Sequence, residues 1–145
     1  MSSAVIADAG AIVAALHERD QWHMDARTLF SELPKPFLTC EPAITEACYL
    51  LDKLPKGRER VLGLLGSGVL KLDFVLSKEI DSVSGLLQKY RDVPMSLADA
   101  CLVRMCEINS GSLIFTFDSD FNIYRKHRNR PIPLVLFDGK QADGE

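Results

Sequence analysis

Short apolar runs alternate with amphipathic stretches along the chain, and this alternation predicts strands followed by helices. The apolar runs have the length expected of strands, and they cover residues 4–7, 37–39, 69–75, 113–117 and 134–137. Apolar residues at helical spacing between them predict helices over residues 9–17, 20–31, 42–51, 58–65, 77–90 and 96–109. This order favours an α/β fold: a central parallel β-sheet flanked by helices on both faces.

The composition fits one globular domain. The chain has 145 residues, of which 47% are hydrophobic and 26% are charged, and this is enough to fill a core. No repeat, linker or low-complexity stretch divides it, so we expect a single domain over residues 1–145, with a frayed tail at about 140–145. The net charge of -3 argues against binding by non-specific phosphate attraction, but it leaves open a nucleic-acid enzyme whose metal ions bring the positive charge.

The cysteines and the first residues bear on the compartment. None of the cysteines forms a C-x-x-C pair, and we expect buried thiols in a reducing cytosol at Cys40, Cys48, Cys101 and Cys106. The first ten residues lack the basic and long apolar regions of a signal peptide, and no apolar stretch reaches the roughly 20 residues that span a bilayer. These features predict a cytoplasmic protein.

Acidic side chains stand where predicted strands end and helices begin. Asp8 and Asp118 follow strands, where an aspartate commonly caps a helix or forms a turn. Asp99 completes the S-x-x-D spacing of a capping box with Ser96. Asp120 is explained as a first-turn acid favoured by a helix dipole. Each acid therefore has a structural explanation when it is taken alone.

Taken together, the acids indicate a metal site. In a parallel sheet the ligand lies beyond the carboxyl ends of the strands, which is where Asp8 and Asp118 are expected. Glu46 lies among apolar residues of a predicted helix, and we expect it to face inward, although an edge position that reaches water would also explain it. Converging carboxylates repel and raise one another's pKa, and hard cations such as Mg²⁺ and Mn²⁺ relieve that repulsion.

Four motifs resemble those of the PIN-domain family, and within it the VapC-like toxins of prokaryotic toxin–antitoxin pairs. They are V-I-A-D-A-G from Val5, T-E-A from Thr45, S-L-A-D-A from Ser96 and T-F-D-S-D-F from Thr116. The resemblance spans nearly the whole chain. It implies a PIN-like three-layer sandwich and a Mg²⁺- or Mn²⁺-dependent endoribonuclease. The implied catalytic and metal-binding residues are Asp8, Glu46, Asp99 and Asp118, with Asp120 as an accessory metal ligand.

One position departs from the family pattern. The family often has Ser, Thr or Asn two places after its first aspartate, and this chain has Gly10. A hydrogen bond to Asp8 is then missing, which weakens metal binding when outer partners orient a ligand. A PIN-like module that has lost activity and binds RNA or protein is therefore an alternative, which metal titration with and without RNA would test.

A basic run follows the last two acids. The resemblance implies an RNA substrate, and phosphate contacts are expected from Arg125, Lys126, Arg128 and Arg130. The alternative is a solvated loop. The resemblance also implies an antitoxin laid in a groove, and homodimerisation. Apolar anchors for such a contact are present at Trp22, Met24, Leu29 and Phe30, although core packing is the simpler explanation of each.

A response-regulator receiver is a second alternative. That fold needs an acidic pair after its first strand and a phosphoacceptor aspartate at the end of its third. Here Asp8 stands alone and Asp73 lies within its strand, whereas Lys140 after the last strand agrees with a receiver. Phosphorylation by acetyl phosphate would distinguish it. No ligand-spaced cluster includes a histidine, so we interpret His17, His23 and His127 as surface or structural residues.

Overall fold

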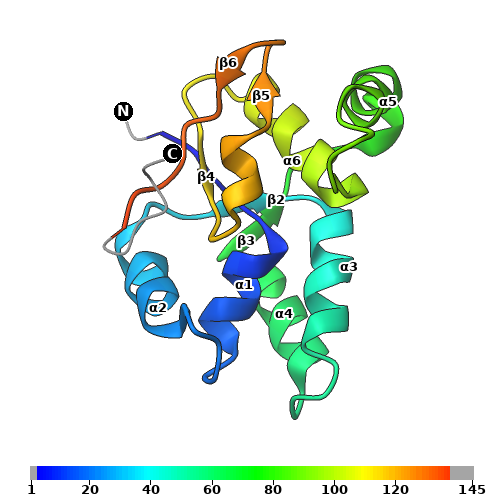
Figure 1. The fold of residues 1–145 in the computed structure, drawn as a ribbon. Coiled ribbons are helices and arrows are strands. Elements are labelled where there is room, and N and C mark those ends of the chain that lie inside the picture. Colours follow the sequence, from blue (N-terminus) through cyan, green and yellow to red (C-terminus); the bar gives the residue numbers. More distant parts are fainter. Residues whose placement is uncertain (1–2, 138–145) are drawn as a thin grey trace.

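A four-stranded parallel sheet forms the centre of the protein (Figure 1). The structure is a computed structural model that describes residues 3–137, so the predicted tail at 140–145 lies outside the described residues. The strands are β1 (Val5–Ala7), β2 (Phe37–Thr39), β3 (Leu70–Leu72) and β4 (Leu113–Phe115), in the order β3-β2-β1-β4. A receiver domain has the different strand order 2-1-3-4-5, so the sheet does not support that alternative.

The register of the central strand determines which residues meet at the carboxyl edge. Ala7 of β1 pairs with Phe115 of β4, so Asp8 and Thr116 are the next residues along two neighbouring parallel strands. On the other side of β1, the Thr39 hydroxyl donates to the Ala7 carbonyl at 2.9 Å. Asp8 is thereby placed at the edge where parallel-sheet proteins bind ligands.

Helices cover both faces of the sheet. The first core cluster joins the sheet to α1 (Ala9–Leu16), α2 (His23–Glu32), α3 (Glu41–Leu50) and α4 (Gly57–Gly66). The second cluster joins the opposite face to α5 (Ile80–Lys89) and α6 (Leu97–Ile108). Neighbouring strand residues alternate between the clusters, because Val5 and Ala7 belong to the first and Ile6 to the second. The predicted three-layer α/β fold is therefore confirmed.

Several predicted elements change at their ends. The second helix begins at His23, not Asp20, because the Asp20 carboxylate accepts from the Trp22 N–H and forms a turn before it. Helix α5 begins at Ile80 and not at residue 77, and Ser77 lies instead in the 3₁₀ helix η1 (Leu76–Lys78). The side chain of Ile80, the first residue of this helix, is 50% exposed.

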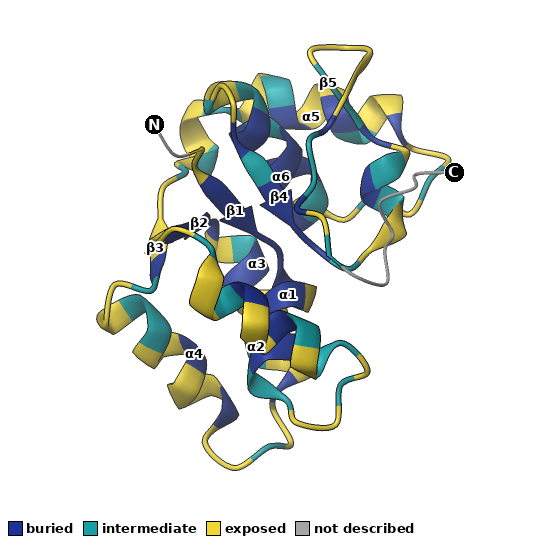
Figure 2. Cartoon of the chain, turned by 90° about the vertical axis from the view of Figure 1, so that its left-hand side faces the viewer, coloured by how far each residue is buried: buried dark blue, intermediate teal, exposed yellow. Residues whose placement is uncertain are grey.

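The C-terminal part of the described chain differs most from the prediction. The strand expected over residues 134–137 is reduced to an isolated bridge between Leu134 and Ile114. A 3₁₀ helix, η2 (Ser119–Asn122), and an antiparallel hairpin of β5 (Arg125–Lys126) and β6 (Arg130–Pro131) occupy the segment between β4 and that bridge. In Figure 2 the loop between β5 and β6 is coloured as exposed, whereas strands β1 and β2 are coloured as buried.

Two further observations concern the burial of the cysteines and the length of the helices. All four cysteines are free thiols, and all except the partly buried Cys48 are buried. Within residues 3–137, no helix is long and apolar enough to cross a membrane.

Candidate active site

Asp8 is the most buried of the predicted site residues. It caps α1, where its Oδ1 accepts from the Ala11 N–H at 2.8 Å and its Oδ2 accepts from the Thr116 hydroxyl. Only 6% of the residue is exposed. Burial raises the pKa of Asp8 to about 7; the two hydrogen bonds oppose this shift, and the charges of Asp118 and Asp99 add to it. The Asp8 carboxyl group therefore titrates near neutral pH.

Thr116 connects Asp8 to Asp118. Its hydroxyl donates to Asp8 and accepts from the Asp118 N–H at 2.9 Å, so one buried side chain bridges the two predicted ligands. Asp118 then caps η2 by accepting from the Asp120 N–H at 2.9 Å. Asp120 lies in the first turn of η2, as predicted, and burial, together with the charge of Asp118, raises its pKa.

Asp99 lies in the first turn of α6, where the predicted capping box is present. The Asp99 N–H donates to the Ser96 hydroxyl at 3.0 Å, and the Ser96 N–H donates to Asp99 Oδ2 at 3.3 Å. The Tyr124 hydroxyl donates to the same oxygen at 3.0 Å. Burial raises the pKa of Asp99, these donors oppose the shift, and Asp118 adds to it.

Glu46 lies on α3 at the rim of this group. The expectation that it faces inward is wrong, because its side chain is exposed and reaches water as the alternative proposed. It still contributes to the same electrostatic group. Partial burial raises the pKa of Glu46, and the charges of Asp99 and Asp118 raise it further.

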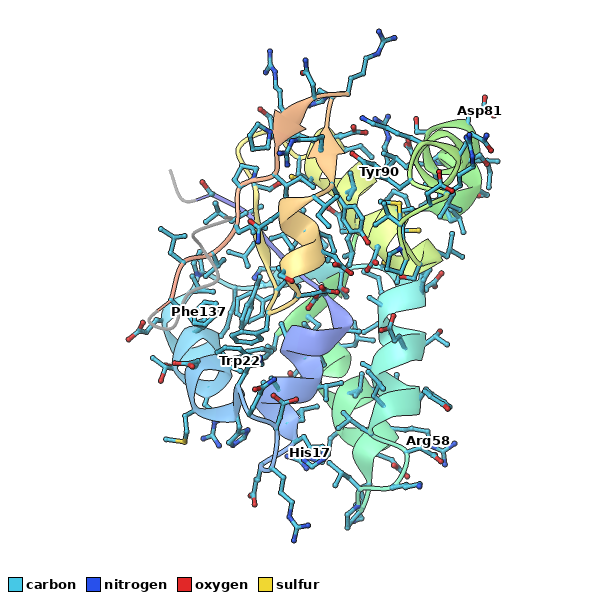
Figure 3. The ribbon with its side chains drawn as sticks, viewed as in Figure 1. His17, Trp22, Arg58, Asp81, Tyr90 and Phe137 are labelled. Carbon is cyan, nitrogen blue, oxygen red and sulfur yellow. The ribbon has the colours of Figure 1, made fainter. Side chains whose placement is uncertain are left out.

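The structure thus brings the four predicted acids together electrostatically. Figure 3 shows side-chain oxygen atoms gathered where the start of α1 meets η2 and α3. The ion pairs among residues 3–137 join Arg58 to Asp52 and Arg104 to Glu79 and Glu107, so none of them neutralises these four acids. A donor set made only of carboxylate oxygens fits a hard cation such as Mg²⁺ or Mn²⁺.

The described side chains do not form a complete metal-binding site. Across residues 3–137, no group of three or more His, Cys, Asp or Glu side chains is arranged so that it could hold a metal ion. The acids are close enough for their charges to interact, while each of the three aspartates is held by donors of its own. Full coordination would therefore require waters, or small movements of these side chains.

Gly10 leaves space beside Asp8. A Cβ atom added at Gly10 would lie 3.6 Å from Asp8 Oδ1, which is an ordinary contact. The hydrogen bond that a serine there would offer is partly replaced, because Thr116 and the Ala11 N–H already hold both Asp8 oxygens.

The basic run folds into the β5–β6 hairpin, and its cations differ in their partners. Arg125 Nη1 donates to the carbonyls of Asn122 and Tyr124 at 2.7 and 3.1 Å, so this guanidinium closes the end of η2. Lys126 is partly buried, whereas Arg128 and Arg130 are exposed. Three of the four predicted RNA contacts therefore have charged groups that no described hydrogen bond or ion pair engages.

Side chains of α5 and α6 hold the hairpin in place. Glu107 accepts from the His127 N–H at 2.7 Å, and the Lys89 ammonium donates to the Arg128 carbonyl. The hydroxyl of Tyr90, which is labelled in Figure 3, accepts from the Arg125 N–H at 2.8 Å. The loop residues His127 and Arg128 have positive φ angles of 48° and 79°, and these contacts help to maintain that conformation.

The predicted apolar anchors of α2 mostly belong to the core. Trp22 stacks on Phe117 with ring centroids 5.3 Å apart, and Phe30 packs edge-on against Phe37 at 4.9 Å. Leu29 is buried, and of the four anchors only Met24, at 77%, is mainly exposed. Core packing, the simpler interpretation of these residues, describes three of them.

A pocket of about 590 Å³ lies away from the acids. Its lining comes from the C-terminal end of α1 and from the α3–α4 region: Leu16, His17, Glu18, Arg19, Leu54, Pro55 and Arg60. Asp8 caps the opposite end of α1, so this pocket is not part of the acidic site.

Sequence reasoning missed Thr116 and Tyr124, which hold the acids, and Tyr90, which holds the hairpin. Thr116 stands inside the T-F-D-S-D-F motif, and its place two residues before Asp118 is a signal for a hydroxyl that caps the turn. Tyr90 and Tyr124 carry no comparable local signal, because their hydroxyl partners are 35 and 25 positions away.

Comparisons with known proteins support the fold. The sequence matches no protein-family model and no curated protein sequence. The structure is similar to the crystal structure of VapC20 from Mycobacterium tuberculosis, described as a toxin that cleaves the sarcin–ricin loop, with a TM-score of 0.76. The similarity covers 88% of this chain and 100% of that chain, at 18% sequence identity. The chain therefore has the PIN-like α/β fold that the resemblance predicted.

Proposed function

We propose that this chain is a metal-dependent endoribonuclease and the toxin of a toxin–antitoxin pair, with residues 1–145 acting as one PIN-like domain. The observation that carries the proposal is the group of four carboxylates at the carboxyl edge of the sheet, in the fold of an RNA-cleaving toxin. In support, the charge of Asp118 raises the pKa values of Asp8, Glu46 and Asp99, and no described ion pair neutralises the four acids.

The protein's own groups have defined tasks in this proposal. One or two divalent cations, Mg²⁺ or Mn²⁺, are held by Asp8, Glu46, Asp99 and Asp118, with Asp120 as an accessory ligand. When bound, such an ion supplies Lewis acidity toward water and phosphate oxygens. Thr116 holds Asp8 and Asp118 at a fixed separation. The exposed Glu46 completes the site from the solvent side, where RNA arrives.

The hairpin supplies the positive charge that RNA requires. Lys126, Arg128 and Arg130 contact phosphates and offset the repulsion between RNA and the acids, whereas Arg125 contributes mainly through its position. The first RNA to test is a sarcin–ricin type stem–loop, because the structurally similar toxin cleaves that loop.

Protein partners are also part of the proposal. A cytoplasmic toxin of this type pairs with a small antitoxin and forms a homodimer. The exposed apolar side chains of α3 and α4, Tyr49, Leu50 and Leu62, supply surface for such contacts. Size-exclusion chromatography with light scattering tests the dimer, and a monomer at micromolar concentration would contradict it.

The decisive experiment measures RNA cleavage with Mn²⁺, with EDTA, and with variants of single acids. Asp8→Asn and Asp99→Asn should each lower cleavage and Mn²⁺ affinity roughly 100-fold or more, because each removes the charge of one ligand while it keeps the shape of the side chain. Asp81→Asn, an exposed acid on α5, is the matched control. Cleavage that persists in EDTA, or Asn variants that bind Mn²⁺ like the parent, would overturn the proposal.

A further inference from the structure

Tyr124 is fully buried, yet its hydroxyl reaches a predicted metal ligand. The residue is 0% exposed and donates to Asp99 Oδ2 at 3.0 Å. Its ring packs edge-on against Phe121 and Tyr90, with centroids 5.2 and 5.3 Å away. The aromatic contacts fix the ring, and the fixed ring places the hydroxyl.

Tyr124 belongs to the turn that Asp118 begins. Asp118 caps η2, the Phe121 N–H donates to the Asp118 carbonyl at 3.2 Å, and the Tyr124 N–H donates to the Asp120 carbonyl at 3.3 Å. The Tyr124 side chain then crosses to α6 and bonds Asp99. One short segment therefore carries one predicted ligand and holds another, 25 positions earlier in the chain.

This connection opposes the repulsion between two like charges. Asp99 and Asp118 come from different elements, and their carboxylates would separate without an attachment. The capping box alone holds Asp99 Oδ2 through a rather long contact of 3.3 Å from the Ser96 N–H. Tyr124 adds a shorter hydrogen bond to the same oxygen, and no residue in the range 3–137 makes a hydrogen bond to Oδ1. Oδ1 is thus left available while the carboxylate is held from its other side.

We propose that Tyr124 is a positioning residue that holds the Asp99 carboxylate in the orientation needed to bind a divalent cation. The inference rests on the proposed metal-dependent function. It assigns a role to a residue outside the four acids, because partners that orient a ligand contribute to its affinity for the metal.

Tyr90 provides a matched control. It is also a buried tyrosine, its ring packs against that of Tyr124, and its hydroxyl accepts a hydrogen bond from the Arg125 N–H at 2.8 Å. A Tyr→Phe change at either position removes one buried hydroxyl and retains the ring. Only the change at Tyr124 removes a hydrogen bond to an acid.

The experiment measures Mn²⁺ affinity by isothermal titration calorimetry without RNA, for the parent and for Tyr124→Phe, Tyr90→Phe and Asp99→Asn. Tyr124→Phe should weaken Mn²⁺ binding about 10-fold or more, whereas Tyr90→Phe should stay within about twofold of the parent. In the Asp99→Asn background, Tyr124→Phe should cause no further loss, because the coupling passes through Asp99.

The outcomes separate this inference from the proposed function. If Asp99→Asn binds Mn²⁺ like the parent, the metal site itself is wrong. If Asp99→Asn loses affinity but Tyr124→Phe retains it, the metal site stands and the positioning role is wrong. Three outcomes would mean that the Tyr124 hydroxyl serves the fold alone. The two tyrosine changes could cause equal losses of affinity, or Tyr124→Phe could cause an additional loss in the Asp99→Asn background. The third outcome is a Tyr124→Phe protein that circular dichroism shows to be unfolded.

Discussion

The acidic edge of the sheet and the basic hairpin carry opposite charges, and different parts of them are held in place by hydrogen bonds. At the acidic edge the three aspartate side chains are fixed, by backbone N–H groups and by the hydroxyls of Thr116 and Tyr124. In the hairpin the backbone is fixed, by Glu107, Lys89 and Tyr90, while Arg128 and Arg130 extend into solvent.

This difference corresponds to what each region would bind. A small divalent ion requires ligands at defined positions, so the side chains themselves must be held. A phosphate backbone requires positive charge at roughly the right place, and mobile cations suffice for that. Arg125 is the exception within the hairpin, because its guanidinium is bound like a structural group.

The largest predicted effect is on the stability of the metal-free protein. The pKa of Asp8 is about 7 in the folded state and 3.8 in the reference state. Its contribution is therefore fully present below about pH 3.8 and is lost as the pH rises through 7. Asp8→Asn removes this dependence, so its stability relative to the parent should increase by roughly 3 to 5 kcal/mol from low to high pH.

Urea unfolding in EDTA at several pH values between 4 and 8 measures this difference. The matched variant is Asp81→Asn, whose stability should follow that of the parent at every pH. A stability difference between Asp8→Asn and the parent that does not change with pH would show that burial does not raise the pKa of Asp8.

The next effect concerns the bridge between two acids. Thr116→Val removes the hydroxyl that donates to Asp8 and accepts from Asp118, and it should cost roughly 1–3 kcal/mol of stability. It should also weaken Mn²⁺ binding about 10-fold. Thr39→Val is the control, because Thr39 is equally buried and its hydroxyl donates to the Ala7 carbonyl instead of to an acid. If both valine variants retain the parental Mn²⁺ affinity, Thr116 supports the fold without orienting the acids.

A smaller effect is expected in the hairpin. The triple change of Lys126, Arg128 and Arg130 to Ala should reduce the salt dependence of single-stranded RNA binding by about 0.7 in log–log slope for each phosphate that the variant no longer binds. Mn²⁺ affinity should not change. Arg125→Ala should lower stability more than it lowers this slope, because its guanidinium bonds carbonyls.

A triple change of Arg19, Arg27 and Arg60 to Ala removes the same charge from exposed positions elsewhere. Measured in the inactive Asp99→Asn background, it should leave the slope near that of the parent. Equal slopes for the two triple variants would mean that RNA does not follow the hairpin.

The smallest effect is expected at Gly10. Gly10→Ser places a Cβ at an ordinary contact distance from Asp8 and replaces a poor helix former, so stability should rise by about 0.5 kcal/mol. Since Thr116 and Ala11 already hold Asp8, Mn²⁺ affinity should change by less than about threefold. A much larger gain in affinity and cleavage would favour the alternative of a weakened module.

The acids were predictable from sequence because their positions follow local rules. Asp8, Asp99 and Asp118 each stand at a strand end or a helix start, and capping chemistry places such residues without knowledge of the rest of the fold. Glu46 was predicted less well, since a single helix pattern does not show whether the partly apolar face around it is covered.

The hairpin and the tyrosines could not be predicted in the same way. The hairpin backbone is stabilised by Lys89 and Glu107, which lie 39 and 20 positions earlier in the chain. The role of the Tyr124 hydroxyl depends on its hydrogen bond to Asp99, which lies on α6, 25 positions earlier in the chain. Hydrophobic periodicity describes which face of an element is buried, but not which polar atom it meets there.

The contact between Asp8 and Thr116 also has a consequence for synthesis. These residues are 108 positions apart, and the strands that carry them are neighbours in the sheet. A ribosome makes Asp8 108 residues before Thr116, so helices α1 to α6 are translated between the two. Pairing between such distant segments forms late in synthesis. A growing chain that ends before residue 116 therefore carries Asp8 without Thr116, which follows β4, beside it. The catalytic edge we propose would therefore form only after residue 116 has been translated.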